Sequence, residues 1–322
     1  MSEFGVGLPG TGSPAQWAGF AARLEDLGFD VLSVFGDLGY QPPIPALLAA
    51  AGATRRLRLG PACLNPFLTH PVEIAGQIAA LDLASDGRAY LGLARGAWLE
   101  RIGIVQERPL TALRDAAAIV ARLLAGDDDG YPGRVFTTEP GVRLLFPRRR
   151  PAVPLLLGGW GPRVTALAGG IAAELKIGGT ANPRLVALAR RRLGSAPTRI
   201  VTGAVTVVDH DGSAARARAR RHAAVYVDAV GGLDPTLHVD PELLSRLREA
   251  LWRGEPEQAG ALLDDGLLDA FALAGTPSEV AGRAASLLVA GAHRIDFGPP
   301  LGLEGPEAGA ELLARQVLPA LR

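Results

Sequence analysis

The sequence has one cysteine and one lysine, and each scarcity limits what the protein can be. Cys63 stands alone among 322 residues, so neither an intramolecular disulfide nor a cysteine-rich zinc site is possible. Lys176 is the only lysine, and we attribute the arginine bias to a GC-rich genome. The first residues, MSEFGVGLPG, lack the basic and then apolar pattern of a secretory signal. We therefore expect a protein of the reducing cytoplasm.

Net charge and long apolar runs are also lacking. Lys and Arg together number 33, as do Asp and Glu, so no net field attracts nucleic acid or an anionic membrane. Charged residues interrupt each alanine-rich stretch before it reaches the roughly 20 apolar residues that span a bilayer. We expect a soluble protein that binds neither nucleic acid nor membrane. Its 48% hydrophobic content is enough for a large core.

Several catalytic motifs are missing. The five histidines are scattered, and no His-x-x-x-His or clustered carboxylate pattern occurs, so we predict no metal site. There is no Gly-x-Ser-x-Gly elbow of a serine hydrolase. There is also no Gly-x-x-x-x-Gly-Lys-Ser/Thr loop for a nucleotide triphosphate. These enzyme classes are therefore excluded.

What the chain does contain is a repeated alternation along nearly its whole length. Short apolar or β-branched runs alternate with alanine- and leucine-rich amphipathic stretches, which is typical of βα units around a parallel sheet. The helix expected at 13–27 has Ser13 as its N-cap and Gly28 beyond its end. Eight units predict one α/β domain over 1–322, a (β/α)8 TIM barrel. The expected strands are 4–8, 31–35, 57–63, 89–94, 154–158, 174–178, 200–208 and 293–298.

Two regions interrupt this rhythm, residues 127–150 and 230–269. We interpret both as insertions in barrel loops. Because barrel active sites lie at the C-terminal ends of the strands, we expect the insertions to shape or cover the pocket.

Chemically useful side chains follow several of the expected strands. Asp37 and His70 are ionisable candidates for moving a proton, although Asp37 suits a loop cap and His70 a helix start equally well. Cys63 is more often a small buried side chain than a reactive thiol. Trp98 and Trp160 more often pack than stack on a ligand, but at strand ends a flat ligand beside them is plausible.

Two glycine turns follow the fifth and sixth expected strands. Gly158 to Arg163 reads GGWGPR, and Gly178 to Thr180 reads GGT, each leading toward a helix. Glycines before a helix can present backbone N–H groups to a phosphate. The same glycines can merely permit tight packing, and spacing alone leaves both interpretations open.

Three ordered stretches resemble a known family: LGPACLNPFLTHP at 59–71, AALDLASDGR at 79–88 and LGLARG at 91–96. They resemble the luciferase-like monooxygenase superfamily, whose members are (β/α)8 barrels that carry FMN or the deazaflavin coenzyme F420. Residues 109–126, 159–162 and 291–298 are similar to the F420-dependent branch around methylenetetrahydromethanopterin reductase.

This resemblance implies a site on the chain. It implies a cis peptide bond between Ala62 and Cys63 that faces the deazaflavin ring, and a phosphate tail held by the two glycine turns. Asp37 and His70 are the catalytic candidates, and no metal is implied. The implied cofactor-binding residues are Asp37, Ala62, Cys63, Leu64, Asn65, Ala94, Arg95, Gly159, Trp160, Gly161, Pro162, Gly178, Gly179 and Thr180.

The resemblance also implies a function. We expect an F420-dependent reductase or dehydrogenase that transfers a hydride between the deazaflavin and a small substrate, at a C=N or activated C=C bond. The first strand, FGVGL, lacks the acidic residue of the methanopterin reductases, which suggests another substrate. The alternatives are an FMN-dependent monooxygenase that uses O2 and a catalytically silent cofactor-binding barrel. A homodimer is the default expectation.

Overall fold

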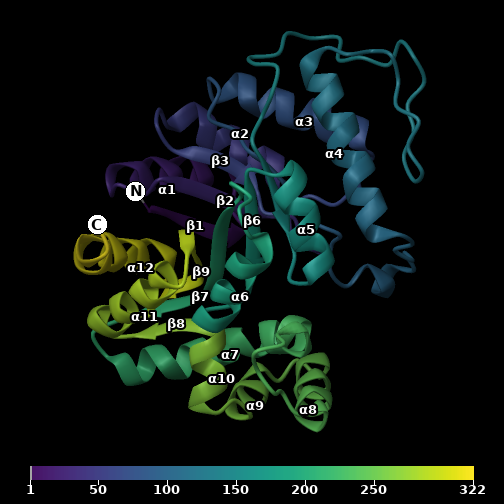
Figure 1. The fold of residues 1–322 in the computed structure, drawn as a ribbon. Coiled ribbons are helices and arrows are strands. Elements are labelled where there is room, and N and C mark those ends of the chain that lie inside the picture. Colours follow the sequence, from purple (N-terminus) through teal and green to yellow (C-terminus); the bar gives the residue numbers. More distant parts are fainter. Residues whose placement is uncertain (1) are drawn as a thin grey trace.

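Eight parallel strands surround one axis in the computed structural model, which describes residues 2–322 (Figure 1). Around the barrel they run in the order β3-β2-β1-β9-β7-β6-β5-β4. Isolated bridges from Leu59 to Ala89 and from Leu64 to Leu93 join β3 to β4, so the barrel is nearly closed. The eight are β1 (Glu3–Pro9), β2 (Val31–Phe35), β3 (Arg58–Pro61), β4 (Leu91–Leu93), β5 (Leu155–Gly158), β6 (Glu174–Gly178), β7 (Arg199–Val208) and β9 (Ala292–Gly302).

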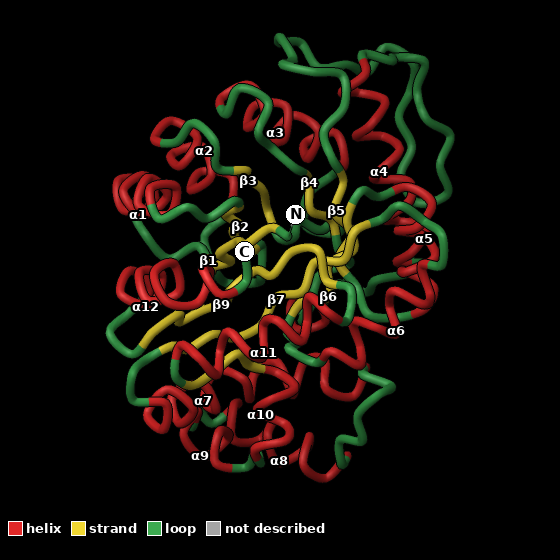
Figure 2. Tube along the Cα trace, turned by 60° about the vertical axis from the view of Figure 1, so that its left-hand side comes forward, coloured by secondary structure: helices red, strands yellow, loops and turns green. Residues whose placement is uncertain are grey.

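Helices cover the outside of the barrel (Figure 2). Many begin with proline directly after a capping residue, and Ser13 and Thr276 form capping boxes with Gln16 and Glu279. Short 3₁₀ or π turns lie at 99–102, 231–233, 313–317 and 318–320. Among residues 2–322 no helix is long and apolar enough to cross a membrane. The helices are α1 (Pro14–Asp26), α2 (Pro43–Ala53), α3 (Pro71–Ala84), α4 (Pro109–Ala125), α5 (Pro162–Ile171), α6 (Pro183–Leu193), α7 (Gly212–Val230), α8 (Pro241–Trp252), α9 (Pro256–Ala261), α10 (Asp265–Phe271), α11 (Pro277–Val289) and α12 (Pro306–Leu312).

The expected TIM barrel is confirmed, and each of the eight expected strands overlaps a barrel strand. The sequence analysis missed β8 (Ala272–Gly275), which pairs with the end of β7 outside the barrel order. Its residues, ALAG, contain no β-branched or aromatic side chain and directly follow α10. Their pattern is therefore indistinguishable from the end of a helix.

The two interruptions of the repeat lie at opposite ends of the molecule (Figures 1 and 2). Residues 127–150 follow a helix rather than a strand and return along the outside of α4. There the Asp115 carboxylate accepts backbone N–H groups of Arg134 at 2.9 Å and Val135 at 2.7 Å. None of these residues lines the cavity described below, whereas Val230, the first residue of the second interruption, does, and the expectation that the insertions shape or cover the pocket stays a prediction. Residues 230–269 include α8, α9 and α10.

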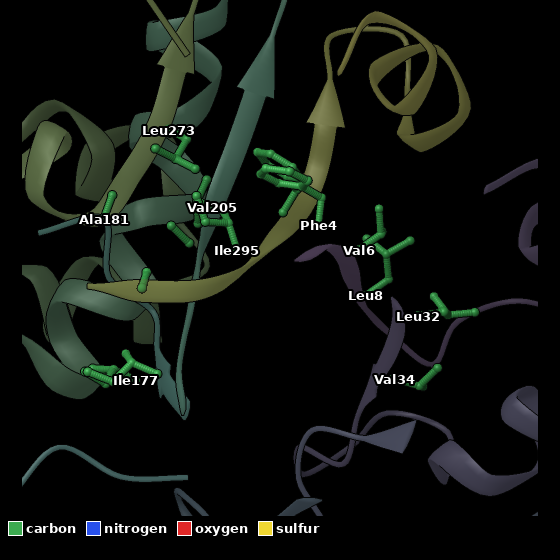
Figure 3. Close-up of a cluster of buried hydrophobic side chains, with 14 of the residues drawn as sticks. Phe4, Val6, Leu8, Leu32, Val34, Ile177, Ala181, Val205, Leu273 and Ile295 are labelled. Carbon is green, nitrogen blue, oxygen red and sulfur yellow. The ribbon is translucent and has the colours of Figure 1, made fainter. Parts of the chain in front are cut away.

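Each barrel strand presents alternate residues to the helices and to the barrel interior, as the pleat requires. Figure 3 shows Phe4, Val6 and Leu8 of β1 in the buried apolar layer beneath the helices. The residues between them, Gly5 and Gly7, face the interior. A Cβ at Gly5 would collide with the Asp296 carboxylate, so glycine leaves room there for a buried charge.

Candidate functional site

A cavity of about 750 Å³, including its part open to solvent, lies at the C-terminal ends of the barrel strands. More than half of the lining residues are glycine or alanine, so the walls leave space beside the backbone. The lining residues are Gly7, Phe35, Asp37, Ala62, Ala97, Trp98, Lys176, Gly178, Gly179, Gly203, Ala204, Tyr226, Ala229, Val230, Asp296 and Gly298.

A buried ion pair forms the floor of this cavity. Lys176 of β6 donates to the carboxylate of Asp296 on β9, and both side chains are almost fully buried. Arg294 lies 3.0 Å from the other oxygen of this carboxylate. Burial raises the pKa of Asp296, but the adjacent Arg294 and Lys176 lower it by more, so the net pKa is below its ordinary value.

Charged and polar side chains continue below the floor into the barrel interior. Arg294 donates to Glu174 at 3.0 Å, and its guanidinium lies 5.2 Å from the centre of the Tyr90 ring. The Ser33 and Tyr90 hydroxyls are 2.7 Å apart. Burial raises the pKa of Tyr90, so this phenol stays protonated. This polar layer lies directly beneath the floor, and within residues 2–322 Nε and Nη2 of Arg294 and Oδ1 of Asp296 form no hydrogen bond.

Asp37 lines the cavity from the loop after β2 and is half-buried. Burial raises the pKa of its carboxyl group, and the positive charge of Lys176 offsets part of that rise. A carboxyl group with a raised pKa keeps its proton further toward neutral pH. Asp37 thus has the position and the chemistry to exchange a proton with a bound ligand.

His70 does not line the cavity. It is the N-cap of α3, where its Nδ1 accepts the backbone N–H of Val72 at 3.3 Å. The exposed ring packs edge-on against Phe136, with 5.6 Å between the ring centroids. This geometry supports the helix-start interpretation, and the expectation that His70 lies beside the cofactor face is not met.

The Ala62–Cys63 peptide bond is cis, as the resemblance implied. Ala62 lines the cavity at this bond. The Cys63 thiol lies inside the barrel, 3.1 Å from where a Cβ on Gly158 would be. Burial raises the pKa of Cys63 to about 12, so the thiol is protonated at neutral pH. Cys63 therefore acts as a small packing group.

Of the next four implied cofactor residues, Leu64 and Ala94 hold the ends of β3 and β4 together. The N–H of Leu64 donates to Gly92 at 2.9 Å, and the N–H of Ala94 donates to Leu64 at 3.0 Å. The Asn65 side chain accepts the N–H of Leu68 at 2.9 Å. Arg95 is exposed. None of these side chains lines the cavity, so their contact with a cofactor stays a prediction.

The two glycine turns lie side by side. The Trp160 indole N–H donates to the Gly178 carbonyl at 3.0 Å, which joins one turn to the other. Gly161 is the N-cap of α5, with Pro162 as the first helical residue, and has no side chain to occupy the helix end. The N–H of Gly159 donates to Lys176 at 3.0 Å. The turns thus place a helix N-terminus beside Gly178 and Gly179, which line the cavity.

Thr180 does not contribute to the lining. It is fully buried, and its hydroxyl donates to the Ala270 carbonyl at 3.2 Å and accepts the N–H of Asn182 at 3.1 Å. The Thr180 hydroxyl is thus already engaged within the protein, and its contact with a ligand stays a prediction. Its neighbour Gly179 has φ +77°, a conformation that favours glycine.

Sequence reasoning missed three of the polar residues that line the cavity: Lys176, Asp296 and Tyr226. A signal for the first two was present, since each is a charged residue between two apolar neighbours of an expected strand. With period 2 each faces away from its apolar neighbours, and in a closed barrel that direction is the interior. Tyr226 belongs to α7, where no strand-end argument applies.

Known proteins resemble this chain over most of its length. The family described as luciferase-like monooxygenase matches residues 1–294. A 5,10-methylenetetrahydromethanopterin reductase of Archaeoglobus fulgidus is 28% identical over 317 residues, which cover 92% of this chain and 93% of that protein. An F420-dependent glucose-6-phosphate dehydrogenase of Microbacterium testaceum is 32% identical over 175 residues, 49% of this chain and 51% of that protein. The solved coenzyme F420 dependent tetrahydromethanopterin reductase from Methanopyrus kandleri has a TM-score of 0.88 at 24% identity, covering 100% of this chain and 99% of that chain.

Proposed function

The chain belongs to the luciferase-like monooxygenase family, and we propose that it is an oxidoreductase that binds coenzyme F420 and transfers a hydride to or from a small organic substrate. The matched relatives include a methylenetetrahydromethanopterin reductase and an F420-dependent dehydrogenase. The observation that carries the proposal is the cavity at the strand ends. It is walled largely by glycine and alanine and lies between the cis bond at Ala62 and the second glycine turn, Gly178 and Gly179, to which the Trp160 indole joins the first turn.

The residues present fit a flat cofactor with a phosphate-bearing tail. A Cβ at Gly7 would lie 2.9 Å from the Phe35 ring, and at Gly179 a Cβ would lie 2.7 Å from the Tyr226 ring, so larger residues would crowd the cavity wall. In the proposal Ala62 contacts the ring, and the turns at 159–162 and 178–179 hold the tail. The coenzyme, when bound, supplies a hydride donor or acceptor.

We assign the proton of the reaction to Asp37. It is the carboxyl group in the cavity lining whose pKa is raised by burial, whereas Asp296 is held ionised by Lys176 and Arg294. Reduction of a C=N or activated C=C bond adds a hydride to one atom and a proton to the other. In this proposal the protonated Asp37 gives that proton, and in the reverse direction its carboxylate takes it.

A binding experiment tests the proposed cofactor. The purified protein is titrated with oxidised F420, reduced F420 and FMN, and binding is followed by fluorescence and calorimetry. Saturable binding of F420 in preference to FMN supports the proposal. Preference for FMN, together with O2 consumption when reduced FMN is supplied, would replace it with a monooxygenase. Tight coenzyme binding without transfer to any acceptor would indicate a catalytically silent barrel.

For the assembly and location of the protein we propose a cytoplasmic homodimer. Its support is indirect: the chain has one cysteine, so it needs no oxidising compartment, and symmetric dimers are the commonest oligomers. Size-exclusion chromatography with light scattering tests the dimer. A monomeric mass at micromolar concentration would reject it.

A further inference from the structure

The chain's only lysine lies where a lysine is costly to bury. Lys176 is 6% exposed and belongs to the floor of the cavity. Burying an ammonium group is unfavourable unless it is paired and hydrogen-bonded. An ammonium has three N–H donors, and within residues 2–322 the only acceptor bonded to Lys176 is Asp296. Two donors remain for a partner outside the protein.

The walls beside Lys176 leave space for such a partner. Gly178 lies two residues further along β6, and Gly203 lies opposite on β7. A Cβ at Gly203 would lie 3.4 Å from Cε of Lys176, and at Gly178 a Cβ would lie 3.9 Å from the same atom. Glycine at both positions leaves the end of the lysine side chain open to the cavity.

The charges around the floor leave Lys176 only partly neutralised. Asp296 is shared between Lys176 and Arg294. Glu174 and Glu3, the other carboxylates that meet Arg294, also pair with Arg58 and Arg199. The remaining acid of the cavity is Asp37, where burial favours the neutral form. In the ion-pair network of the floor four cations, Lys176, Arg294, Arg58 and Arg199, face the three carboxylates of Asp296, Glu174 and Glu3, which favours an anionic ligand beside Lys176.

We propose that the cavity floor is a subsite for an anionic group of carboxylate size, bound by the Lys176 ammonium that Asp296 holds in place. The inference deepens and rests on the proposed function, because it makes the substrate an organic acid when the anion is the substrate's. The same chemistry is available from the reduced coenzyme if its ring binds as an anion. Whether the anion belongs to the substrate or to the coenzyme, it accepts hydrogen bonds from the two free N–H donors of Lys176. The experiments below distinguish the two sources.

A single lysine makes this subsite directly observable. Protein grown with lysine labelled with ¹³C at Cε gives one lysine resonance, that of Lys176, without any assignment work. The unchanged chain is titrated with acetate, and in parallel with acetamide, which has the same shape but no charge. We expect a saturable shift with acetate and at least tenfold weaker binding of acetamide. No shift with acetate or with reduced F420, or equal responses to acetate and acetamide, would overturn the proposal.

Repeating the titration on coenzyme-loaded protein identifies the source of the anion. An acetate shift that persists with oxidised F420 bound assigns the subsite to the substrate. An acetate shift that is lost on loading, with a shift produced by reduced but not oxidised F420, assigns it to the ring. A calorimetric titration of Lys176→Met with acetate, beside Lys176→Arg as the charge-retaining control, is expected to lose acetate heat only in the methionine variant.

The same samples keep this inference separate from the proposed function. F420 binding is read independently from coenzyme fluorescence. If F420 binds but the Lys176 resonance responds to no anion, the subsite is wrong and the proposed function stands. If acetate moves the resonance but F420 does not bind, the subsite stands and the proposed cofactor is wrong. The measurement on the unchanged chain does not depend on whether any variant folds.

Discussion

The mouth of the barrel and the interior beneath it are built from opposite kinds of residue on the same strands. At the mouth β6 and β9 present Gly178 and Gly298, and two residues earlier they present Lys176 and Asp296. Strand alternation sends all four toward the interior. The two glycines have no side chain and so leave the space of the cavity, whereas the charged side chains of Lys176 and Asp296 form its floor. The glycines of the mouth thus contribute to binding by leaving room for a ligand, and the residues of the floor contribute by their charge.

The largest effect is expected at the mouth, from Asp37→Asn. Loss of a positioned proton donor should lower turnover by about 10²- to 10⁴-fold while the coenzyme still binds. Since burial raises the pKa of Asp37, the unchanged enzyme should lose reductase rate as pH rises through that pKa. The Asp37→Asn variant should not show this loss of rate with rising pH. Steady-state rates from pH 4 to 9 check both points, and full turnover in the variant would remove Asp37 from the mechanism.

A stability effect is expected in the interior, from Arg294→Met. This change leaves the buried Glu174 and Asp296 carboxylates without a main partner, and breaking such a pair costs about 3 to 5 kcal/mol. Urea unfolding measures the free energy. The control is Arg23→Met, whose ion pair with Glu311 is exposed at 45% and 38%, and which should change stability by less than about 1 kcal/mol. An equal loss of unfolding free energy in the two variants would mean that burial of the interior ion pairs does not matter for stability.

The sequence could predict the mouth better than the floor. The glycine turns, the loop residue Asp37 and the cis bond at Ala62 all belong to strand ends, and a short motif or family resemblance reaches them. The floor depends on β6 and β9, whose partner residues Lys176 and Asp296 are 120 positions apart and meet only when the barrel closes. Local pattern gives the direction of each side chain but not its partner.

Two candidate residues, His70 and Thr180, have polar groups that are engaged outside the cavity for the same reason. His70 and Thr180 both follow expected strands, which is why they were candidates. His70 is used to cap α3, and Thr180 is used to bond the end of α10. A position after a strand thus predicts proximity to the site but not the availability of the polar group, since backbone groups nearby compete for it.

A smaller effect at the mouth is expected from Gly179→Ala. The added Cβ would lie 2.7 Å from the Tyr226 ring, at φ +77°. We expect a cost of about 1 to 2 kcal/mol in stability from the backbone alone, and about tenfold weaker coenzyme binding from the displaced ring. Gly103→Ala is the matched control, with φ +78° and nothing within 4 Å. It should show the backbone cost and unchanged coenzyme binding; a matching loss of binding would make the contact with Tyr226 irrelevant.

The smallest effect is expected at Cys63, which lies where mouth and interior meet. With its pKa at about 12, about one thiol in ten thousand is ionised at pH 8, against roughly one in four for a free cysteine. Alkylation by iodoacetamide should therefore be about 10³-fold slower in the folded protein than in urea, where the thiol is exposed. Mass spectrometry follows the modification. Cys63→Ala should keep activity within about threefold, since the thiol only packs here. Rapid alkylation of the folded chain, or loss of turnover in the alanine variant with its stability intact, would instead show that Cys63 takes part in the chemistry. Cys63 would then belong to the mouth of the barrel and not to the interior.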